Sequence, residues 1–318
     1  MRRATALVIL VAVSSGLWAQ EGAPARPAAP LEPMAALLDA FESYDVVALS
    51  DPHGNQQVHA FHLSLIRDPR LARAVDDIVF ETGNALYQEV VDRYVNGADV
   101  PIDELRLVWQ NTTQRRVGEP PVERPLVAAF FRNVREVNLS RSPGQRLRIL
   151  LGDPPINWAE IETQSDVQPW LYLRDTHPAE LIQREVLDKG RRAFVIYGGM
   201  HLQRQNLFSN YELVDDRRVH TLVQQLEGAG TPVFTVWVNA STDLEALQAD
   251  ISTWPAPSLA HVRGTLLGAA DFETFYPFDV PRARLVEGAL VPIAREEWRT
   301  LPMEEQFDAV LHLGSPAR

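Results

Sequence analysis

The sequence of 318 residues contains no cysteine, and this absence excludes several kinds of structural support and of site. Without thiols the chain has no disulfide framework, no thiolate metal site and no lipid-modified cysteine. It also lacks a basic cluster: the formal net charge is −12, and the densest basic stretch, residues 188–192, precedes an apolar run. Because nucleic-acid surfaces need clustered Lys and Arg, we expect no nucleic-acid partner.

The motifs of several common enzyme classes are missing as well. The sequence has no G-x-S-x-G, no G-x-x-x-x-G-K-[ST] phosphate-binding loop, and no G-x-G-x-x-G after its first apolar run. The zinc-binding pattern H-E-x-x-H is also absent. These absences argue against a serine hydrolase of the usual α/β type, a nucleotide-binding protein and a zinc peptidase of the H-E-x-x-H kind.

The N-terminus has the layout of a secretory signal peptide. Two arginines precede an apolar stretch from Ala4 to Val13, and small residues then lead to Ala19. The apolar stretch is shorter than the roughly 20 residues that cross a bilayer, so we predict a signal peptide over 1–19 and no lasting membrane span. An uncleaved anchor is the alternative. We therefore expect an exported protein, periplasmic or secreted, of a bacterial envelope.

Beyond the N-terminus the sequence predicts one domain. Residues 20–33 are rich in Pro and Ala, which is typical of a linker. From residue 34 to residue 318, no second linker of this kind and no internal repeat interrupts the chain. The hydrophobic content of 46% and the charged content of 23% are ordinary for a globular protein, so we expect a sizeable core over 34–318.

Six short runs are nearly continuous in Val, Ile, Leu and aromatic residues, as in strands that are buried on both faces. They cover residues 45–51, 77–83, 147–153, 192–199, 232–239 and 308–314. The segments between them carry apolar residues at helical spacing. Alternating strands and helices predict an α/β fold, a three-layer sandwich with a mostly parallel central sheet and helices on both faces.

Polar residues follow the predicted strands where ligands bind in open α/β sheets, beyond the carboxyl ends. Asp51 and His53 follow the first run, Glu81 ends the second, Asp153 the third, and His201 follows the fourth. Each residue alone is explained as a turn residue or a helix cap. Together they predict one crevice, in which a carboxylate orients an imidazole as a general base.

Two further groups have alternative interpretations. Arg174 could clamp an anionic ligand group, and either Asp175 or Thr176 could cap the next helix. His59 and His62 are three residues apart on a predicted helix and could join His53 as metal ligands, but the same pattern suits an ordinary amphipathic helix.

Four segments together resemble a known superfamily: VVALSDPHGNQQ, IVFETGNALYQEVVDRYVNG, LLGDPPINW and FVIYGGMHLQR. In order and spacing, over about residues 45–314, they are similar to the erythromycin esterase-like and ChaN-like grouping, which also takes in the TraB and Tiki proteins. Members of this grouping share an α/β core, a G-E-x-H motif after the first strand, a Glu after the second, and a late Gly-x-x-His.

The resemblance implies either hydrolysis or ligand binding. Erythromycin esterase-like proteins are hydrolases, ChaN-like proteins bind haem, and Tiki-type proteins are metal-dependent proteases. On matching positions His53 would be the base, Glu81 its carboxylate partner, and His201 the late histidine. The chain departs from the motif because Ser50 and Asp51 replace Gly and Glu. Asp51 has the shorter side chain, which puts the inherited substrate in doubt.

The leading expectation is an exported hydrolase that acts on an ester or amide bond of a small molecule. His53 would activate water with support from Asp51 and Glu81, and His201 would polarise the substrate or donate a proton. The alternatives are a haem- or metal-binding uptake protein without catalysis, and an inactive scaffold that keeps the crevice.

Asp153 and Arg174 are the expected substrate-binding residues. The same crevice also suits a divalent cation, since carboxylates and imidazoles bind one and would lower the pKa of its water. The candidate metal ligands are Asp51, His53, Glu81 and His201.

Overall fold

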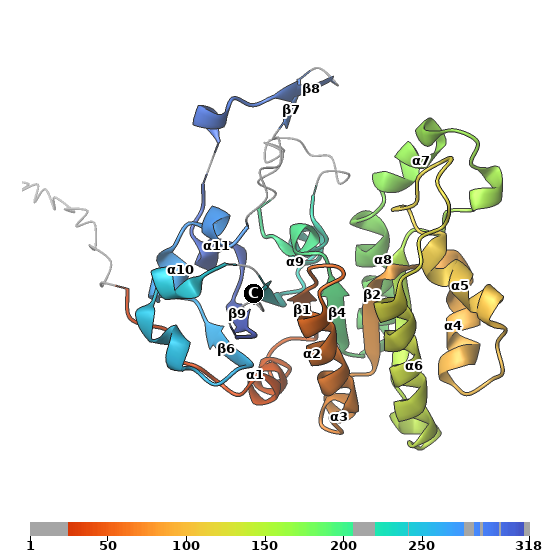
Figure 1. Cartoon of the computed structure of the whole chain (residues 1–318), viewed down its shortest axis with the longest axis horizontal. Helices are drawn as coiled ribbons and strands as arrows, with labels where there is room; N and C mark the ends of the chain where they lie inside the picture. Colours follow the sequence, from red (N-terminus) through yellow and green to blue (C-terminus); the bar gives the residue numbers. More distant parts are fainter. Residues whose placement is uncertain are drawn as a thin grey trace, which may run out of the picture.

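The computed structural model describes residues 25–205, 220–240, 242–276, 283–286, 289–298 and 300–314. The predicted signal peptide lies outside these residues. The described chain forms an α/β sandwich around a central sheet (Figure 1), which confirms the predicted fold class. No helix in this part of the chain combines the length and apolar character needed to cross a membrane.

Seven strands form the central sheet, in the order β3-β2-β4-β1-β5-β9-β6. All neighbouring pairs are parallel except β6 and β9, which are antiparallel. The strands are β1 (Val46–Ser50), β2 (Asp77–Asn84), β3 (Arg148–Asp153), β4 (Ala193–Tyr197), β5 (Val233–Asn239), β6 (Ser258–His261) and β9 (Ala309–His312). Every strand that the apolar runs predicted is therefore present.

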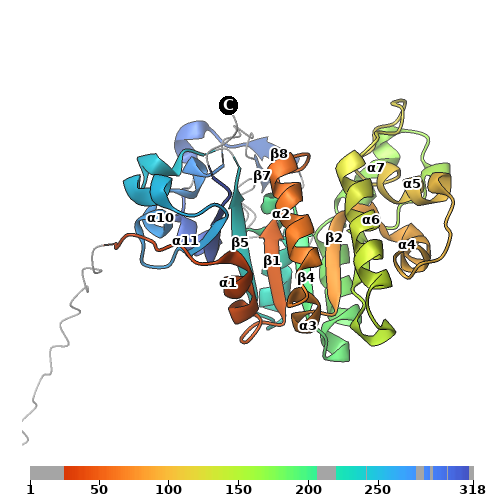
Figure 2. The same ribbon diagram turned by 60° about the horizontal axis from the view of Figure 1, so that its bottom comes forward.

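Helices cover both faces of the sheet, with α2 and α6 side by side on the face that Figure 2 brings forward. The helices are α1 (Pro33–Ala40), α2 (Gln56–Arg67), α3 (Leu71–Ala74), α4 (Gln88–Val95), α5 (Ile102–Gln110), α6 (Pro125–Leu139), α7 (Gln164–Leu171), α8 (Thr176–Glu185), α9 (Leu222–Gly228), α10 (Leu266–Ala269) and α11 (Met303–Gln306).

The two faces of the sheet bury separate hydrophobic cores, because side chains alternate between faces along each strand. In β1, Val47 and Leu49 belong to the core beneath α1 to α6. Val46 and Ala48 belong to the opposite core, beneath α8 to α11. Burial on both faces explains why these strands are continuous apolar runs.

The C-terminal quarter adds two features that the apolar runs did not reveal. The edge strand β6 lies in the segment 252–264, which the sequence presents as a loop because prolines precede a run of only four paired residues. A second, two-stranded antiparallel sheet joins β7 (Ala283–Val286) and β8 (Ala289–Pro292).

The described part of the predicted linker, residues 25–33, runs along this edge of the sheet. Leu31 pairs with Leu259 of β6, and its N–H donates to the Leu259 carbonyl at 2.8 Å. Arg26 forms a bridge with Thr265, and Ala28 is buried. The chain is thus anchored to the domain before α1 begins.

Candidate active site

The site lies at the carboxyl ends of three strands that are adjacent in the sheet, β2, β4 and β1. Glu81 belongs to β2, at an irregularity in its pairing that follows Phe80. Gly198 follows β4 directly, and Asp51 follows β1, where its N–H donates to the Tyr197 carbonyl at 2.8 Å. Parallel strands place these ends at one edge, so residues far apart in sequence meet there.

A turn between β1 and α2 presents Asp51 and His53 at this edge. Gly54 has a φ of +79°, a left-handed conformation that glycine adopts without steric cost. The side chain of Asn55 caps α2 by accepting hydrogen bonds from the N–H groups of Gln57 and Val58. Because Asn55 supplies the cap, Asp51 is not the helix cap that its position after a strand suggests.

Glu81 is the group on which the other polar side chains converge, although its carboxylate is almost fully buried. Arg174 donates to Oε1 at 2.6 Å, and Gln114 donates to the same oxygen at 3.2 Å. The backbone N–H of Gly198 donates to Oε2 at 2.5 Å. The Nε2 atom of His53 lies 3.4 Å from Oε2, so both carboxylate oxygens are occupied.

His53 lies between two carboxylates. Its Nδ1 is 2.9 Å from Oδ2 of Asp51, and its Nε2 faces Glu81. Burial alone would lower the pKa of His53, but the negative charges of Glu81 and Asp51 outweigh this effect and raise the pKa to about 10. At neutral pH His53 is therefore an imidazolium, whereas the sequence had suggested a base that is ready to accept a proton.

His201 occupies the opposite side of Glu81, on the short 3₁₀ turn Gly199–Leu202. Its Nε2 lies 3.8 Å from Oε1 of Glu81, and its Nδ1 lies 2.8 Å from Oδ1 of Asp175. Burial alone would lower the pKa of His201, but the negative charges of Asp175 and Glu81 outweigh this effect and raise the pKa. In turn, Asp175 accepts a hydrogen bond from the N–H of Leu222 at 2.8 Å.

The positive groups around Glu81 also keep it ionised. Burial would raise the pKa of this carboxyl, but His53, His201 and Arg174 hold it well below its usual range. The site is thus a buried cluster in which Arg174 and two histidines of raised pKa face the carboxylate of Glu81, while Asp51 and Asp175 contact the other ring nitrogens of the two histidines.

Two adjacent glycines allow this close packing. A Cβ atom on Gly198 would lie 3.0 Å from Oε2 of Glu81 and 3.6 Å from Nε2 of His53. A Cβ atom on Gly199 would lie 2.4 Å from the ring of Trp237, which is closer than packed atoms allow. A side chain at position 198 would press on Glu81 and His53, and one at position 199 would displace Trp237.

A cavity of about 500 Å³ opens over the charged cluster. Asp51, His53, Glu81, Gln114, Arg174 and His201 line its polar side. Its lining also includes the aromatic residues Trp237, Phe275 and Tyr276. A site with convergent polar groups and aromatic residues in its lining suits an organic molecule of moderate size.

The structure therefore brings together five of the predicted site residues, namely Asp51, His53, Glu81, Arg174 and His201. Asp153 differs from this set. It ends β3, one strand further from the centre, and does not line the cavity. Burial raises its pKa to about 7, and its oxygens accept hydrogen bonds from the N–H and hydroxyl of Thr113 at 2.8 and 2.5 Å.

Three contributors were not expected from the sequence. Asp175 was interpreted as a helix cap, but its side chain makes no capping hydrogen bond and contacts His201 instead. Its position beside Arg174 was the only signal. Gln114 carries no motif, and Gly198 is only the glycine of the late Gly-x-x-His, so the folded chain alone reveals their contacts with Glu81.

The cluster does not fit a metal ion or a haem iron in the arrangement seen here. Among the residues that the structure describes, no group of three His, Asp or Glu side chains is placed to hold a metal, and this includes His59 and His62. The carboxylate of Glu81 is engaged by Arg174 and Gly198. Both ring nitrogens of His53 and of His201 face carboxylates, so neither ring offers iron a vacant nitrogen.

Comparison with known proteins supports the fold and leaves the chemistry open. No family model and no curated protein matches the sequence. A succinoglycan biosynthesis protein of known structure has a TM-score of 0.57 at 10% identity, over 90% of this chain and 94% of the other. A protein from Bacillus cereus has a TM-score of 0.50 at 10% identity, over 91% and 95%. At this identity the likeness shows a shared fold alone.

The haem-binding ChaN of Campylobacter jejuni is a more distant match. Its TM-score is 0.40 at 11% identity, over 66% of this chain and 88% of the other. A likeness at this level does not bear on the function of the present chain.

Proposed function

We propose that this protein is a hydrolase that cleaves an ester or amide bond of a small organic molecule. The observation that carries the proposal is the convergence of His53, His201 and Arg174 on one buried carboxylate, Glu81, at the floor of the cavity. Proton-transfer groups with displaced pKa values that gather in one cavity are characteristic of active sites.

His53 is the proposed base, and its deprotonated form is the active one. Asp51 fixes the ring by accepting the Nδ1 proton, and Nε2, which faces Oε2 of Glu81 at 3.4 Å, takes a proton from a water that enters between the two groups. The oxygen of that water bonds to the carbonyl carbon of the substrate, and the carbonyl π electrons move to the carbonyl oxygen. When the intermediate collapses, the bond to the leaving group breaks and the His53 imidazolium returns the proton to it.

Arg174 and His201 stabilise the negative charge of this intermediate. Arg174 and His201 line the same cavity and hold their positions through Glu81 and Asp175 before any substrate binds. Preorganised charges of this kind need no rearrangement during the reaction, which is why they lower its barrier.

The test is turnover on a panel of carboxylic esters and amides. We expect wild-type protein to hydrolyse members of the panel, and His53→Gln to lower kcat by about 10²- to 10⁴-fold, the usual contribution of a general base. Because only neutral His53 is active, kcat/KM should rise about tenfold per pH unit from neutrality towards the pKa of about 10.

The matched control is His261→Gln, which replaces an exposed histidine of β6 that lines neither cavity. Equal turnover in His53→Gln and in this control would refute the assignment of the base. A haemin titration addresses the alternative of ligand binding: a saturable absorption band that is lost in His53→Gln would favour a haem-binding protein over a hydrolase.

Export to the periplasm or the medium is part of the proposal and rests on the N-terminal sequence. N-terminal sequencing of the mature protein should begin at Gln20, after cleavage behind Ala19. An intact Met1 on protein recovered from the cell envelope would overturn the cleavage in favour of an uncleaved anchor, and recovery from the cytoplasm alone would overturn export.

A further inference from the structure

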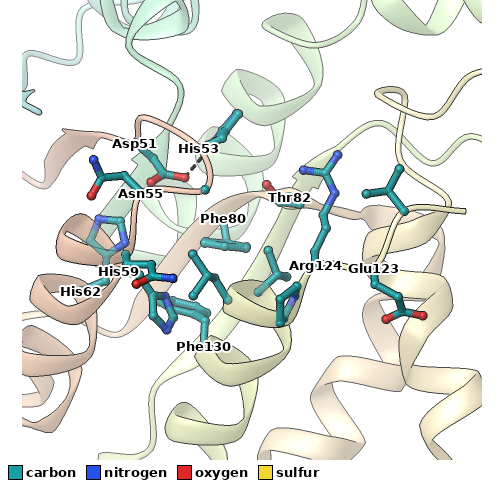
Figure 3. A pocket seen from close by; sticks show the side chains of 16 residues that line it. Asp51, His53, Asn55, His59, His62, Phe80, Thr82, Glu123, Arg124 and Phe130 are labelled. Carbon is teal, nitrogen blue, oxygen red and sulfur yellow. Dashed lines mark hydrogen bonds and ion pairs between the residues drawn. The ribbon is translucent and has the colours of Figure 1, made fainter. Parts of the chain in front are cut away.

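A second cavity, of about 440 Å³, is lined in part by the loop that carries Asp51 and His53 (Figure 3). Asp51 and His53 line both cavities, so the proposed reaction centre borders each of them. The second cavity lies between α2 and the start of α6, and Phe80 and Phe130 form an aromatic part of its lining, with ring centroids 4.5 Å apart.

Arg124 brings a positive charge to this cavity. Its Nη2 donates to Oε1 of Gln114 at 2.7 Å, while its Nε is buried and has no hydrogen-bond partner. Within the described chain no carboxylate lies within ion-pair distance of its guanidinium. The neighbouring Glu123 is directed away from it in Figure 3 and accepts a hydrogen bond from Gln110 at 2.9 Å.

The N-terminus of α6 adds hydrogen-bond donors beside this guanidinium. The helix has 15 residues and begins with Pro125, and no side chain caps it. The N–H groups of Leu126 and Val127 have no hydrogen-bond partner in the described part of the chain, and both residues line the cavity. The positive end of the helix dipole favours an anion at such a position.

His62 provides an independent sign of a missing ligand. Its side chain is only 3% exposed and lines the same cavity, and its Nε2 has no partner among the described residues. Burial lowers the pKa of His62 to about 4, so the ring is neutral. A buried polar atom without a partner is costly unless a ligand or water satisfies it.

We propose that the second cavity binds a carboxylate group on an aromatic or apolar part of the substrate, with Arg124 and the first turn of α6 as its donors. One guanidinium supplies the positive charge, and two backbone N–H groups supply further donors, that a carboxylate takes as partners. In this proposal the substrate spans both cavities, with its scissile bond at His53. Only the position of this scissile bond rests on the proposed function.

Asp51 is the other acidic group that lines this cavity, besides Glu123. Oδ2 of Asp51 pairs with Nδ1 of His53, and the positive charge of His53 offsets the charge of this carboxylate at neutral pH. The imidazoles of His59 and His62 both have lowered pKa values and add no charge there. Arg124 is thus a positive charge in the lining of the second cavity that has no direct ion pair among the described residues, although Glu81 and Asp153 act on it from a greater distance.

The test is binding of benzoate, followed through the NMR shifts of the Leu126 and Val127 amides in the full-length protein. Neutral benzamide serves as the isosteric control. We expect benzoate to bind and benzamide to bind at least tenfold more weakly, since the charged contact to Arg124 is lost. Arg124→Gln should weaken benzoate binding by a similar factor, whereas Arg116→Gln, an exposed residue outside the cavity, should not.

A second pair of variants keeps the test independent of any damage to the fold. Leu126→Asp places a carboxylate in the cavity at a helix position that favours acidic residues, so it should block benzoate. Leu126→Asn, of the same size but neutral, should block it far less. Equal affinity of the wild type for benzoate and benzamide would overturn the proposal. Equal loss of benzoate binding in Leu126→Asp and Leu126→Asn would also overturn it. So would tighter binding of phenyl phosphate than of benzoate. None of these measurements depends on turnover, so a failure here is distinct from a failure of the ester and amide panel.

Discussion

At the scale of residues, Glu81 determines the protonation of its neighbours. The carboxylate accepts hydrogen bonds from Arg174 and Gly198 and faces the imidazoles of His53 and His201. A buried charge of this kind is tolerated only with such partners, and it raises the pKa of both histidines in return. The chemistry of the site therefore belongs to the cluster and not to the single histidine of the motif.

Gly198→Ala tests this packing directly. The added methyl group would lie 3.0 Å from Oε2 of Glu81, so the carboxylate must move away from the Gly198 N–H and from His53. We expect a folded protein in which the pKa of His53 falls towards its ordinary value and turnover is strongly reduced. Gly228→Ala is the control, because a Cβ atom there meets no neighbour. Unchanged titration of His53 in Gly198→Ala would contradict the account.

The sequence indicated most of these residues but not their relations. Asp51, His53, Glu81 and His201 were identified because each follows or ends an apolar run. Asp175 was not, because an acid before a helix has a simpler explanation as a cap. The protonation state of His53 also depends on Glu81, whose distance from it no local pattern specifies.

At the scale of elements, the loop after β1 is held in place by a link between strands. The hydroxyl of Ser50, almost fully buried, accepts a hydrogen bond from the N–H of Val238 at 2.7 Å. Ser50 stands where the resembled motif has Gly, and it ties the end of β1 to β5. This contact fixes the start of the segment that carries Asp51 and His53.

Ser50→Ala should therefore destabilise the protein. The buried N–H of Val238 would lose its acceptor, which costs about 1–3 kcal/mol of unfolding free energy. Chemical denaturation measures the effect, with Ser140→Ala as control, since that exposed hydroxyl bonds only within its own helix end. Equal stability of the two variants would show that the link contributes nothing.

Strands that are buried on both faces of the sheet could be predicted from the sequence. Six strands are continuous apolar runs because helices cover both faces of the sheet. The edge strand β6 was missed because its four paired residues follow Pro255 and Pro257 and give no comparable signal.

At the scale of the whole molecule, strand order decides which polar residues meet. The order β2-β4-β1 joins Glu81, Gly198 and Asp51, while Asp153 on β3 lies one strand further out and His312 on β9 lies beyond β5. Since nearly every strand ends in a polar residue, the sequence alone could not separate the residues of the site from those that only terminate a strand.

The charge cluster also makes the stability of the fold depend on pH. His53 has a pKa of about 10 when folded and near 6.5 when unfolded, so its contribution is complete below about pH 6.5 and is lost as the pH rises towards 10. We expect the unfolding free energy of wild type relative to His53→Gln to decrease over this interval in urea titrations. A difference that stays constant from about pH 6 to about pH 10 would contradict the linkage.

The most direct test of the central claim, that Glu81 and Asp51 hold His53 as a cation, is an NMR titration of the His53 ring in wild type and in Glu81→Gln. We predict a wild-type midpoint at about pH 10 and a clearly lower midpoint in Glu81→Gln, because the largest favourable charge is removed. A wild-type midpoint near 6.5, or the same midpoint in both proteins, would contradict the account.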